Sequence, residues 1–107
     1  NLFCNSLKFY KMLIQQKQDG SKGSFYIEED GINLAEMTYS MTGTELMIID
    51  HTEVSDTLRG KNVGYQLVKA AVEHARTHNM KILPLCPFAK AMMEKRNEEF
   101  GDVLRPK

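Results

Sequence analysis

The chain has 107 residues, of which 42% are hydrophobic and 26% are charged. That is enough for one domain with a continuous core and too few for two. Fourteen basic residues balance fourteen acidic ones, so the chain lacks the positive excess that drives nucleic-acid binding. No run approaches the ~20 apolar residues of a membrane-spanning helix. We therefore expect a single domain that binds neither nucleic acid nor membrane.

The two cysteines, Cys4 and Cys86, do not lie in a CxxC or CxxH spacing. No zinc ligand set is therefore evident, and no metal is expected. A single disulfide between them is formally allowed, but nothing marks the chain as secreted or stapled by cysteines. The composition favours a reduced, cytoplasmic protein.

Residues 1–11 do not share the pattern of the domain that follows, and Met12 stands directly before the strand-like pair Leu13-Ile14. Two interpretations stay open. Either residues 1–11 are a leader foreign to the natural protein and residues 12–107 form the domain, or the segment is native. N-terminal sequencing of the natural protein separates them, since finding Cys4 there contradicts the first.

The first half of the domain predicts a β-meander. Residues 17–23 are polar and rich in turn formers, which indicates a connection. Asp30-Gly31 is a strong hairpin signal. In the middle strand Ala35, Met37 and Tyr39 alternate with polar residues and should face the core. The expected strands cover residues 25–29, 34–40 and 46–54.

The second half changes to a helical period. The expected elements are a helix over residues 63–78, a strand over 82–85, a helix over 87–97 and a short strand over 100–104. Pro84 should interrupt the ladder of its strand. Residues 46–86 predict a right-handed parallel crossover. The fold class is thus α/β (α+β), with a mixed, mostly antiparallel sheet and two main helices.

The connection before the first helix concentrates positive charge and glycine. Its residues are Arg59, Gly60, Lys61, Asn62, Val63 and Gly64. Free amides and the helix dipole favour an anion at such a place, and glycine lets a phosphate approach closely. The segment lacks both the Walker ending and the full GxGxxG pattern. A phosphate loop and an ordinary glycine-bearing turn therefore both stay open.

Arg59 and Gly64 match the ends of a known motif. The segment resembles the pyrophosphate motif [QR]-x-x-G-x-[GA] of the Gcn5-related N-acetyltransferases (GNAT). Asn62 stands where the family prefers glycine, and asparagine tolerates the left-handed conformation. Over residues 25–104 the chain resembles the small GNAT-like group that includes the human N-acetyltransferase domain-containing protein. The segments that carry this resemblance are His51-Thr-Glu-Val54, the Arg59-Gly60 loop and Leu85-Cys86-Pro87-Phe88.

The resemblance implies a minimal GNAT-like fold whose parallel strands splay apart near Val54 and Cys86. Acetyl-CoA would place its pyrophosphate on the loop and its pantetheine arm between those strands. Because residues 17–23 would replace the usual wall helices, the acceptor pocket should be open or completed by a partner. The implied cofactor-binding residues are Val54, Arg59, Gly60, Lys61, Asn62, Val63, Gly64, Cys86, Phe88 and Lys90.

Cys86 and His51 are the candidate catalytic residues. Cys86 should cap a helix near Lys90, which favours a nucleophilic thiolate, although a buried inert thiol is the alternative. His51, in the strand expected to line the pantetheine slot, could take a proton from an amine or from Cys86. Its alternative is a hydrogen-bonded strand histidine. Glu53 is a weaker candidate base.

His74 and His78 lie four residues apart on the expected helix, but without a third ligand they indicate solvent-facing side chains rather than a metal site.

We therefore expect an acetyl-CoA-dependent N-acetyltransferase with an unknown amine or protein acceptor. Transfer would be direct, with help from His51, or would pass through an acetyl-Cys86 intermediate. The alternatives are a non-catalytic acyl-CoA-binding module and an adaptor that does not bind coenzyme A. The sequence does not decide between a monomer and a homodimer.

Overall fold

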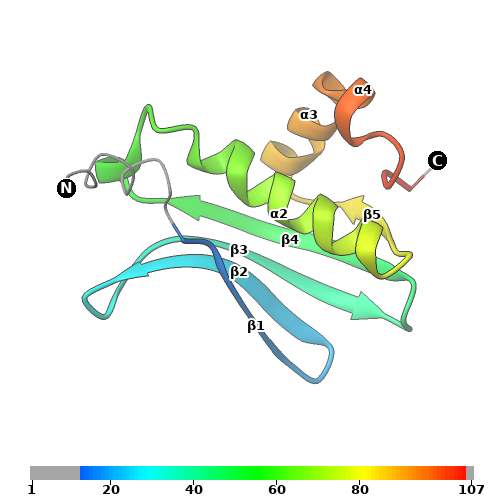
Figure 1. Ribbon diagram of the computed structural model, residues 1–107, viewed down its shortest axis with the longest axis horizontal. Helices are drawn as coiled ribbons and strands as arrows, with labels where there is room; N and C mark the ends of the chain where they lie inside the picture. Colours follow the sequence, from blue (N-terminus) through cyan, green and yellow to red (C-terminus); the bar gives the residue numbers. More distant parts are fainter. Residues whose placement is uncertain (1–12, 106–107) are drawn as a thin grey trace.

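The computed structural model describes residues 13–105, so the expectation for residues 1–11 lies outside it. Five strands form one sheet in the order β1-β2-β3-β4-β5 (Figure 1). Strands β1 to β4 are an antiparallel meander, and β5 is parallel to β4. This mixed sheet confirms the expected fold class. The strands are β1 (Gln15–Asp19), β2 (Lys22–Glu29), β3 (Ile32–Thr42), β4 (Leu46–Val54) and β5 (Lys81–Pro84).

The hairpin between β2 and β3 forms at Asp30 and Gly31, which both have positive φ (52° and 78°). A two-residue turn in which both residues have positive φ matches the right-handed twist of the flanking strands. The alternation predicted for β3 is confirmed, because Ala35, Met37 and Tyr39 are each at most 3% exposed. These side chains define the face of the sheet that carries the core.

The expectation that residues 17–23 form a loop is wrong. Only Gly20 and Ser21 make the turn, and the residues on either side pair as β1 and β2. The segment is polar because β1 is an edge strand whose side chains are mostly exposed. Polar and charged residues on an edge strand discourage pairing with other chains, and they mimic a loop in sequence.

All the helices lie on one face of the sheet (Figure 1). The chain follows β4 with a short 3-10 helix η1 (Asp56–Leu58), then α2 (Val63–Thr77), and follows β5 with α3 (Pro87–Lys95) and α4 (Asn97–Phe100). Asn79, with φ 57°, ends the α2 segment as predicted. Within residues 13–105, no helix is long and apolar enough to span a bilayer.

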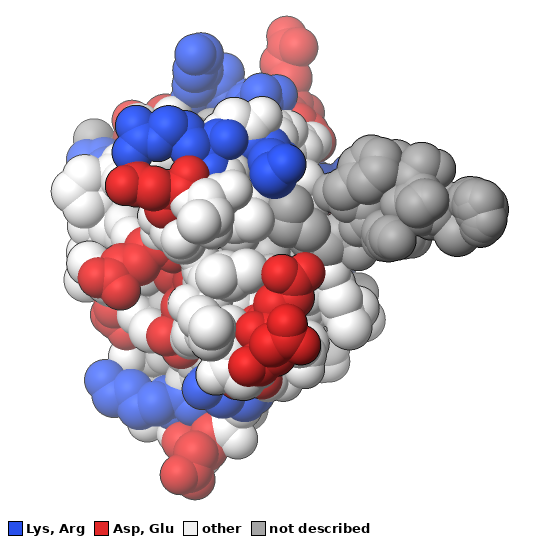
Figure 2. All heavy atoms as spheres, turned by 90° about the vertical axis from the view of Figure 1, so that its left-hand side faces the viewer, with Lys and Arg blue, Asp and Glu red and all other residues white. Residues whose placement is uncertain are grey.

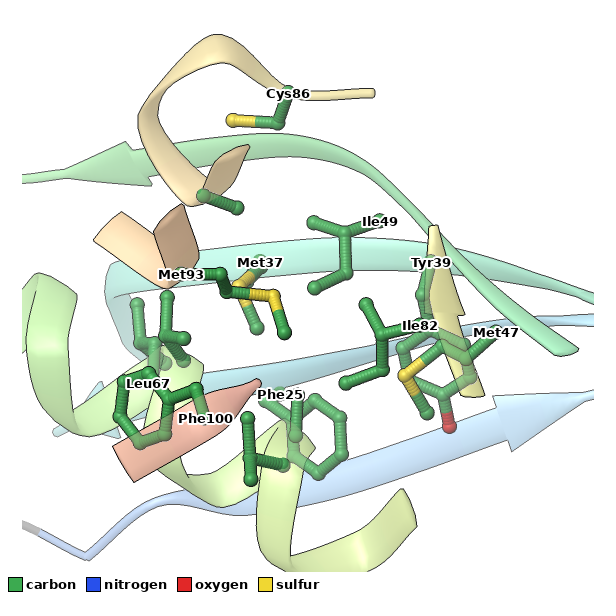
Figure 3. Packing of buried hydrophobic residues seen from close by; sticks show 14 of the residues in the cluster. Phe25, Met37, Tyr39, Met47, Ile49, Leu67, Ile82, Cys86, Met93 and Phe100 are labelled. Atoms are coloured by element: carbon green, nitrogen blue, oxygen red, sulfur yellow. The ribbon is translucent and has the colours of Figure 1, made fainter. Parts of the chain in front are cut away.

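The core fills the space between the helices and the sheet (Figure 3). Phe25 and Tyr39 meet with ring centroids 5.3 Å apart. Leu67 of α2 and Phe100 of α4 are fully buried in the same cluster. Each large buried side chain stabilises the fold by about 1.5–3 kcal/mol. This packing holds the first turns of α2 and α3 beside the end of β4.

A strand over residues 100–104 does not form. Phe100 ends α4 instead, and only Leu104 makes an isolated bridge, to Ile82. The apolar residues of this segment predict a strand, but Phe100 and Val103 are buried by packing under the helices instead. Arg76 of α2 then holds the segment through Asp102, with two N–O distances of 2.8 Å.

Candidate functional site

The parallel pair β4–β5 separates halfway along β4. Pairing runs from Leu46 with Lys81 to Ile49 with Pro84. The carbonyl of Ile49 then accepts from the amides of both Leu85 and Cys86, at 3.0 and 3.1 Å. Beyond it, β4 continues to Val54 with no strand beside it on that edge in the described part of the chain. The splayed strands predicted near Val54 and Cys86 are confirmed.

The free edge of β4 offers backbone hydrogen-bonding groups. The amide of Ser55 donates to the carbonyl of Leu34, at 2.8 Å. Since hydrogen-bonded and non-bonded pairs alternate in an antiparallel ladder, the peptide groups of Thr52 and Val54 point away from β3. They face the gap that opens where β5 ends. An extended, polar ligand arm could pair with them there.

A β-bulge at Asp50 decides which side chains enter this gap. Thr38 pairs with His51 while the neighbouring Tyr39 pairs with Ile49, so Asp50 is the extra residue. Because an extra residue reverses the alternation, Ile49 and Thr52 both face the helices. His51 and Glu53 therefore face the opposite side, which no described helix covers. We call this uncovered side the open face.

This arrangement does not bring the two candidate catalytic residues together. His51 was expected to line the pantetheine slot, but it lies on the open face with its side chain 64% exposed. Its Nε2 is 3.2 Å from Oε2 of Glu53. Cys86 lies on the helix side, where its Sγ is 3.4 Å from Oγ1 of Thr52. Proton transfer between His51 and Cys86 has no direct path in this geometry.

The loop before α2 presents unpaired amides. Asn62 adopts the left-handed conformation with φ 62°, and its side chain makes no capping hydrogen bond. Gly60 also has positive φ, at 82°. No acceptor within residues 13–105 bonds the amides of Val63, Gly64 or Tyr65. These donors stand at the positive end of a 15-residue helix, where an anion is favoured.

A hollow of about 610 Å³ adjoins these amides. It lies between the end of β4, the loop and the first turns of α2 and α3. This volume is within the range of small-molecule and cofactor sites. The hollow brings together seven of the ten predicted cofactor-binding residues: Val54, Arg59, Gly60, Asn62, Val63, Gly64 and Phe88. Leu58, Tyr65 and Met92 complete its lining.

The remaining predicted residues lie around this hollow rather than in its lining. Lys61 and Lys90 are exposed, and Cys86 is buried where β5 gives way to α3. Arg59 lines the hollow, but its guanidinium is 2.6 Å from the carboxylate of Asp56. Both side chains are largely exposed, so this pair is weak and can open.

Cys86 is 5% exposed and is the N-cap residue of α3. Burial alone would raise the pKa of its thiol. The Thr52 hydroxyl and the amides of Ala89 and Phe88 outweigh burial and lower the pKa below its ordinary value. The sulfur makes no capping hydrogen bond of normal geometry, so these amides act mainly through their dipoles. The surroundings therefore stabilise the thiolate more than those of an ordinary cysteine do.

Thr52 is the site residue that sequence reasoning missed. It stands two residues after the bulge, and only the bulge turns it toward Cys86. Its neighbour His51 drew attention because imidazole is a common base.

His74 and His78 lie with ring centroids 4.2 Å apart, but only His78 is exposed; the expectation of a solvent-facing side chain is wrong for His74, which is half-buried with its ring centroid 5.9 Å from that of Phe25. Burial and then the charge of His78 lower the pKa of His74.

A model of the family described as GCN5-related N-acetyl-transferase matches residues 24–103. The structure agrees with this match. Its five-stranded sheet contains a splayed parallel pair, and the N-terminus of α2 lies free beside the gap, as expected for this family. The chain belongs to the GCN5-related N-acetyltransferase family. The resemblance found in the sequence is thereby confirmed.

Individual relatives agree with this assignment. The chain is 28% identical over 95 residues to Protein NATD1 of Gallus gallus, covering 87% of this chain and 86% of the relative. The solution structure of a GCN5-like protein from Staphylococcus aureus is similar with a TM-score of 0.68 and 44% identity, over 90% of both chains. An aminoglycoside N-acetyltransferase, AAC(6')-Iy in complex with CoA, shares the fold with a TM-score of 0.55 and 13% identity, over 89% of this chain and 96% of that one.

Proposed function

We propose that this protein is an acetyl-CoA-dependent N-acetyltransferase that transfers an acetyl group to an amine. One observation carries the proposal: the unpaired amides of Val63, Gly64 and Tyr65 open onto the hollow that adjoins the free edge of β4. Membership of the family and a structural relative that binds CoA support it.

The residues present fit coenzyme A. The first amides of α2, with Arg59 and Lys61 nearby, would hold the pyrophosphate. The peptide groups of Thr52 and Val54 would pair with the pantetheine arm. The absence of a Cβ at Gly64 leaves Phe88 room to lie over the start of α2, where its ring borders the hollow. Lys90, on the exposed side of α3, would add positive charge.

When bound, acetyl-CoA supplies a thioester whose carbonyl carbon an amine can attack. In a direct route the chain needs a group that takes the proton from the attacking nitrogen. His51 suits this role because it faces the open side and is oriented by Glu53 at 3.2 Å. The amine would approach from the open face, while the coenzyme lies on the helix face.

A second route uses Cys86 as a nucleophile. Its thiolate would form a bond to the acetyl carbon, and the bond from that carbon to the coenzyme sulfur would break. The coenzyme would leave as a thiolate that takes up a proton. The amine would then attack the acetyl-cysteine and release the Cys86 thiol. The lowered pKa of Cys86 and its contact with Thr52 support this route.

Calorimetric titration of the full chain with acetyl-CoA tests the binding step, with pantetheine as the control that lacks pyrophosphate. We expect saturable binding of acetyl-CoA and much weaker binding of pantetheine. Equal affinity for the two ligands would contradict the assigned loop. Absence of binding at millimolar ligand would overturn the proposed function.

Release of free coenzyme A in the presence of amines then tests transfer. Binding without any release would indicate an acyl-CoA-binding module instead. Comparison of the wild type with Cys86→Ala separates the routes, because unchanged turnover excludes an obligatory thioester on Cys86. Mass spectrometry after a single turnover should find an acetyl group on Cys86 only if the second route operates.

A further inference from the structure

The proposed function assigns no residues to one part of coenzyme A. The peptide groups of β4 would pair with its pantetheine arm and the first amides of α2 would hold its pyrophosphate, but the adenosine 3′-phosphate lies beyond both. The hollow that adjoins these amides is also lined by Tyr65, Phe88 and Met92. These three side chains therefore border the region into which the rest of the coenzyme would extend.

Phe88 and Met92 belong to one stripe along α3, which Arg96 continues. The three residues are four positions apart, and the amide of Arg96 donates to the carbonyl of Met92 at 3.0 Å, so the helical turn extends to Arg96. Residues at this spacing share one face of a helix, and eight residues correspond to about 12 Å along its axis. The stripe thus carries an aromatic ring, a thioether and a guanidinium in a row that starts in the hollow.

Tyr65 joins this stripe to the start of α2. The guanidinium carbon of Arg96 lies 4.5 Å from the centroid of the Tyr65 ring. Tyr65 is also one of the three residues of α2 whose amides have no acceptor in the described part of the chain. Arg96 is therefore held one side chain away from the position proposed for the pyrophosphate. A second phosphate of the same ligand could reach it.

The guanidinium of Arg96 has donors left for a ligand. The carboxylate of Glu99 lies 3.8 Å from its Nη1, which is too long for a hydrogen bond, and the same carboxylate accepts from the hydroxyl of Tyr65. Arg76, by contrast, donates to both carboxylate oxygens of Asp102 and to the carbonyl of Glu99. The side chain of Arg96 is 46% exposed, so a ligand can approach it.

The charge at this end of the molecule favours an anion on the helix side. In the view of the end at which α2 starts, lysine and arginine side chains lie across the top, on the side of the helices, above acidic ones in the middle (Figure 2). Among basic side chains, arginine suits a phosphate best, because its planar guanidinium can donate two parallel hydrogen bonds. Arg96 therefore has the chemistry that a phosphate at the end of the stripe requires.

We propose that Phe88, Met92 and Arg96 form a subsite for the adenosine 3′-phosphate of coenzyme A, an inference that rests on the proposed transferase function. We call these three residues the nucleotide stripe. The adenine would lie against Met92 and the ring of Phe88, which is 42% exposed, and the 3′-phosphate would accept from the guanidinium of Arg96. The stripe would select the free coenzyme as donor over an acyl-phosphopantetheine carried by a protein, which has no nucleotide.

Calorimetric titration of the full chain with coenzyme A and with 3′-dephospho-coenzyme A tests the phosphate contact. We expect coenzyme A to bind about fivefold more tightly, the effect of one partly exposed ion pair. Arg96→Gln should remove this difference by weakening only the binding of coenzyme A. The matched control Lys95→Gln, at an exposed position next to the stripe, should preserve it. Equal affinities in the wild type, or an equal loss for both ligands in Arg96→Gln, would overturn the assignment.

A second variant tests the adenine contact. Phe88→Leu keeps an apolar side chain beside Gly64 but removes the aromatic face, so the binding of coenzyme A should weaken about fivefold or more. Binding of 4′-phosphopantetheine, which ends before the nucleotide, should stay unchanged when it is followed by backbone amide NMR shifts. An equal loss for the two ligands would mean that Phe88 acts on the pantetheine arm or on the fold, and would contradict its role in the stripe.

The outcome for the stripe is distinguishable from the outcome for the transferase. If acetyl-CoA binds and is used but Arg96→Gln behaves like Lys95→Gln, the stripe is wrong and the proposed function stands. Adenosine 3′,5′-bisphosphate, which carries both phosphates and no pantetheine, probes the stripe without any transfer. If it binds to the wild type and loses affinity in Arg96→Gln, while no amine releases coenzyme A from acetyl-CoA, the stripe stands and the transferase fails.

Discussion

The ring of Phe88 lies against the Cα of Gly64, so that the first residues of α3 contact the first turn of α2. A Cβ built on Gly64 would stand 2.4 Å from Cζ of Phe88. Phe88 is 42% exposed, so its ring can move away, but only by losing this contact. The pair joins the two helix starts that border the hollow assigned to coenzyme A.

Gly64→Ala should therefore destabilise the protein by about 1 kcal/mol, because overpacking costs about 1–3 kcal/mol while alanine in a helix regains up to about 1. In a Phe88→Ala background the overlap is gone and the same change should stabilise by up to about 1 kcal/mol. Urea denaturation of the wild type, the two single variants and the double variant measures this double-mutant cycle. Additive effects would contradict the contact.

Asn62 holds the left-handed position that precedes α2. Asn62→Ala should cost about 1–2 kcal/mol, because a Cβ-bearing residue other than asparagine is strained there, and Asn62→Gly should be close to neutral. Asn79→Ala is the matched control, since Asn79 has φ 57° at the other end of α2. Both alanine variants should lower the unfolding midpoint, but only Asn62→Ala should weaken acetyl-CoA binding in calorimetry.

Thr52 stabilises the thiolate of Cys86. Thr52→Val keeps the shape of the side chain and removes the hydroxyl, so the pKa of Cys86 should rise. Alkylation by iodoacetamide, followed against pH by mass spectrometry, should shift to higher pH in this variant. An unchanged profile would mean that the amides of α3 act without Thr52.

The lowered pKa of Cys86 also makes stability depend on pH. The folded thiol loses its proton at a lower pH than the unfolded thiol. Folding therefore gains stability as pH rises through the folded pKa toward the unfolded one, and loses this contribution as pH falls through the folded pKa. The wild type should gain in urea midpoint relative to Cys86→Ala across this window. A constant difference between the two proteins would argue against a shifted thiol.

Arg76 and Asp102 tie the C-terminal segment to α2. The hydrogen bonds from Arg76 lower the pKa of Asp102, so the carboxylate stabilises the fold above its unfolded pKa. That contribution is lost as pH falls through the folded pKa. Asp102→Asn should lower the unfolding temperature at neutral pH, and the deficit should disappear in acid. Asp19→Asn, on the edge strand β1, should have little effect at either pH.

Local signals were sufficient for most of the fold. The alternation in β3, the Asp30-Gly31 hairpin and the apolar stripe of α2 each depend on neighbouring residues, and each was predicted correctly. The segment 17–23 was not, because a polar edge strand and a loop have the same composition. Phe100 was placed in a strand because its burial under α2 and α3 depends on contacts distant in sequence.

The part of the site formed by the loop before α2 could be predicted from the sequence. The part that depends on the register of β4 against β3 could not. The left-handed Asn62 was expected from its residue type. The bulge at Asp50 was not expected, because the sequence of residues 46–54 is that of an uninterrupted strand. A strict alternation without the bulge assigns His51 to the wrong face of the sheet. The contact of Cys86 with Thr52 follows only from the three-dimensional arrangement.

The extra residue at Asp50 has a consequence for how such a protein can change. After it, even-numbered positions of β4 face the helices, the side proposed for the acetyl donor, and odd-numbered ones face the open side, proposed for the acceptor. On the proposed function, substitutions at positions 51 and 53 would therefore alter acceptor selectivity while the surroundings of Cys86 keep their chemistry. Removing Asp50 would exchange the two sets at once. One strand thus lets the two specificities be varied separately, by evolution or by design, as long as the bulge is kept.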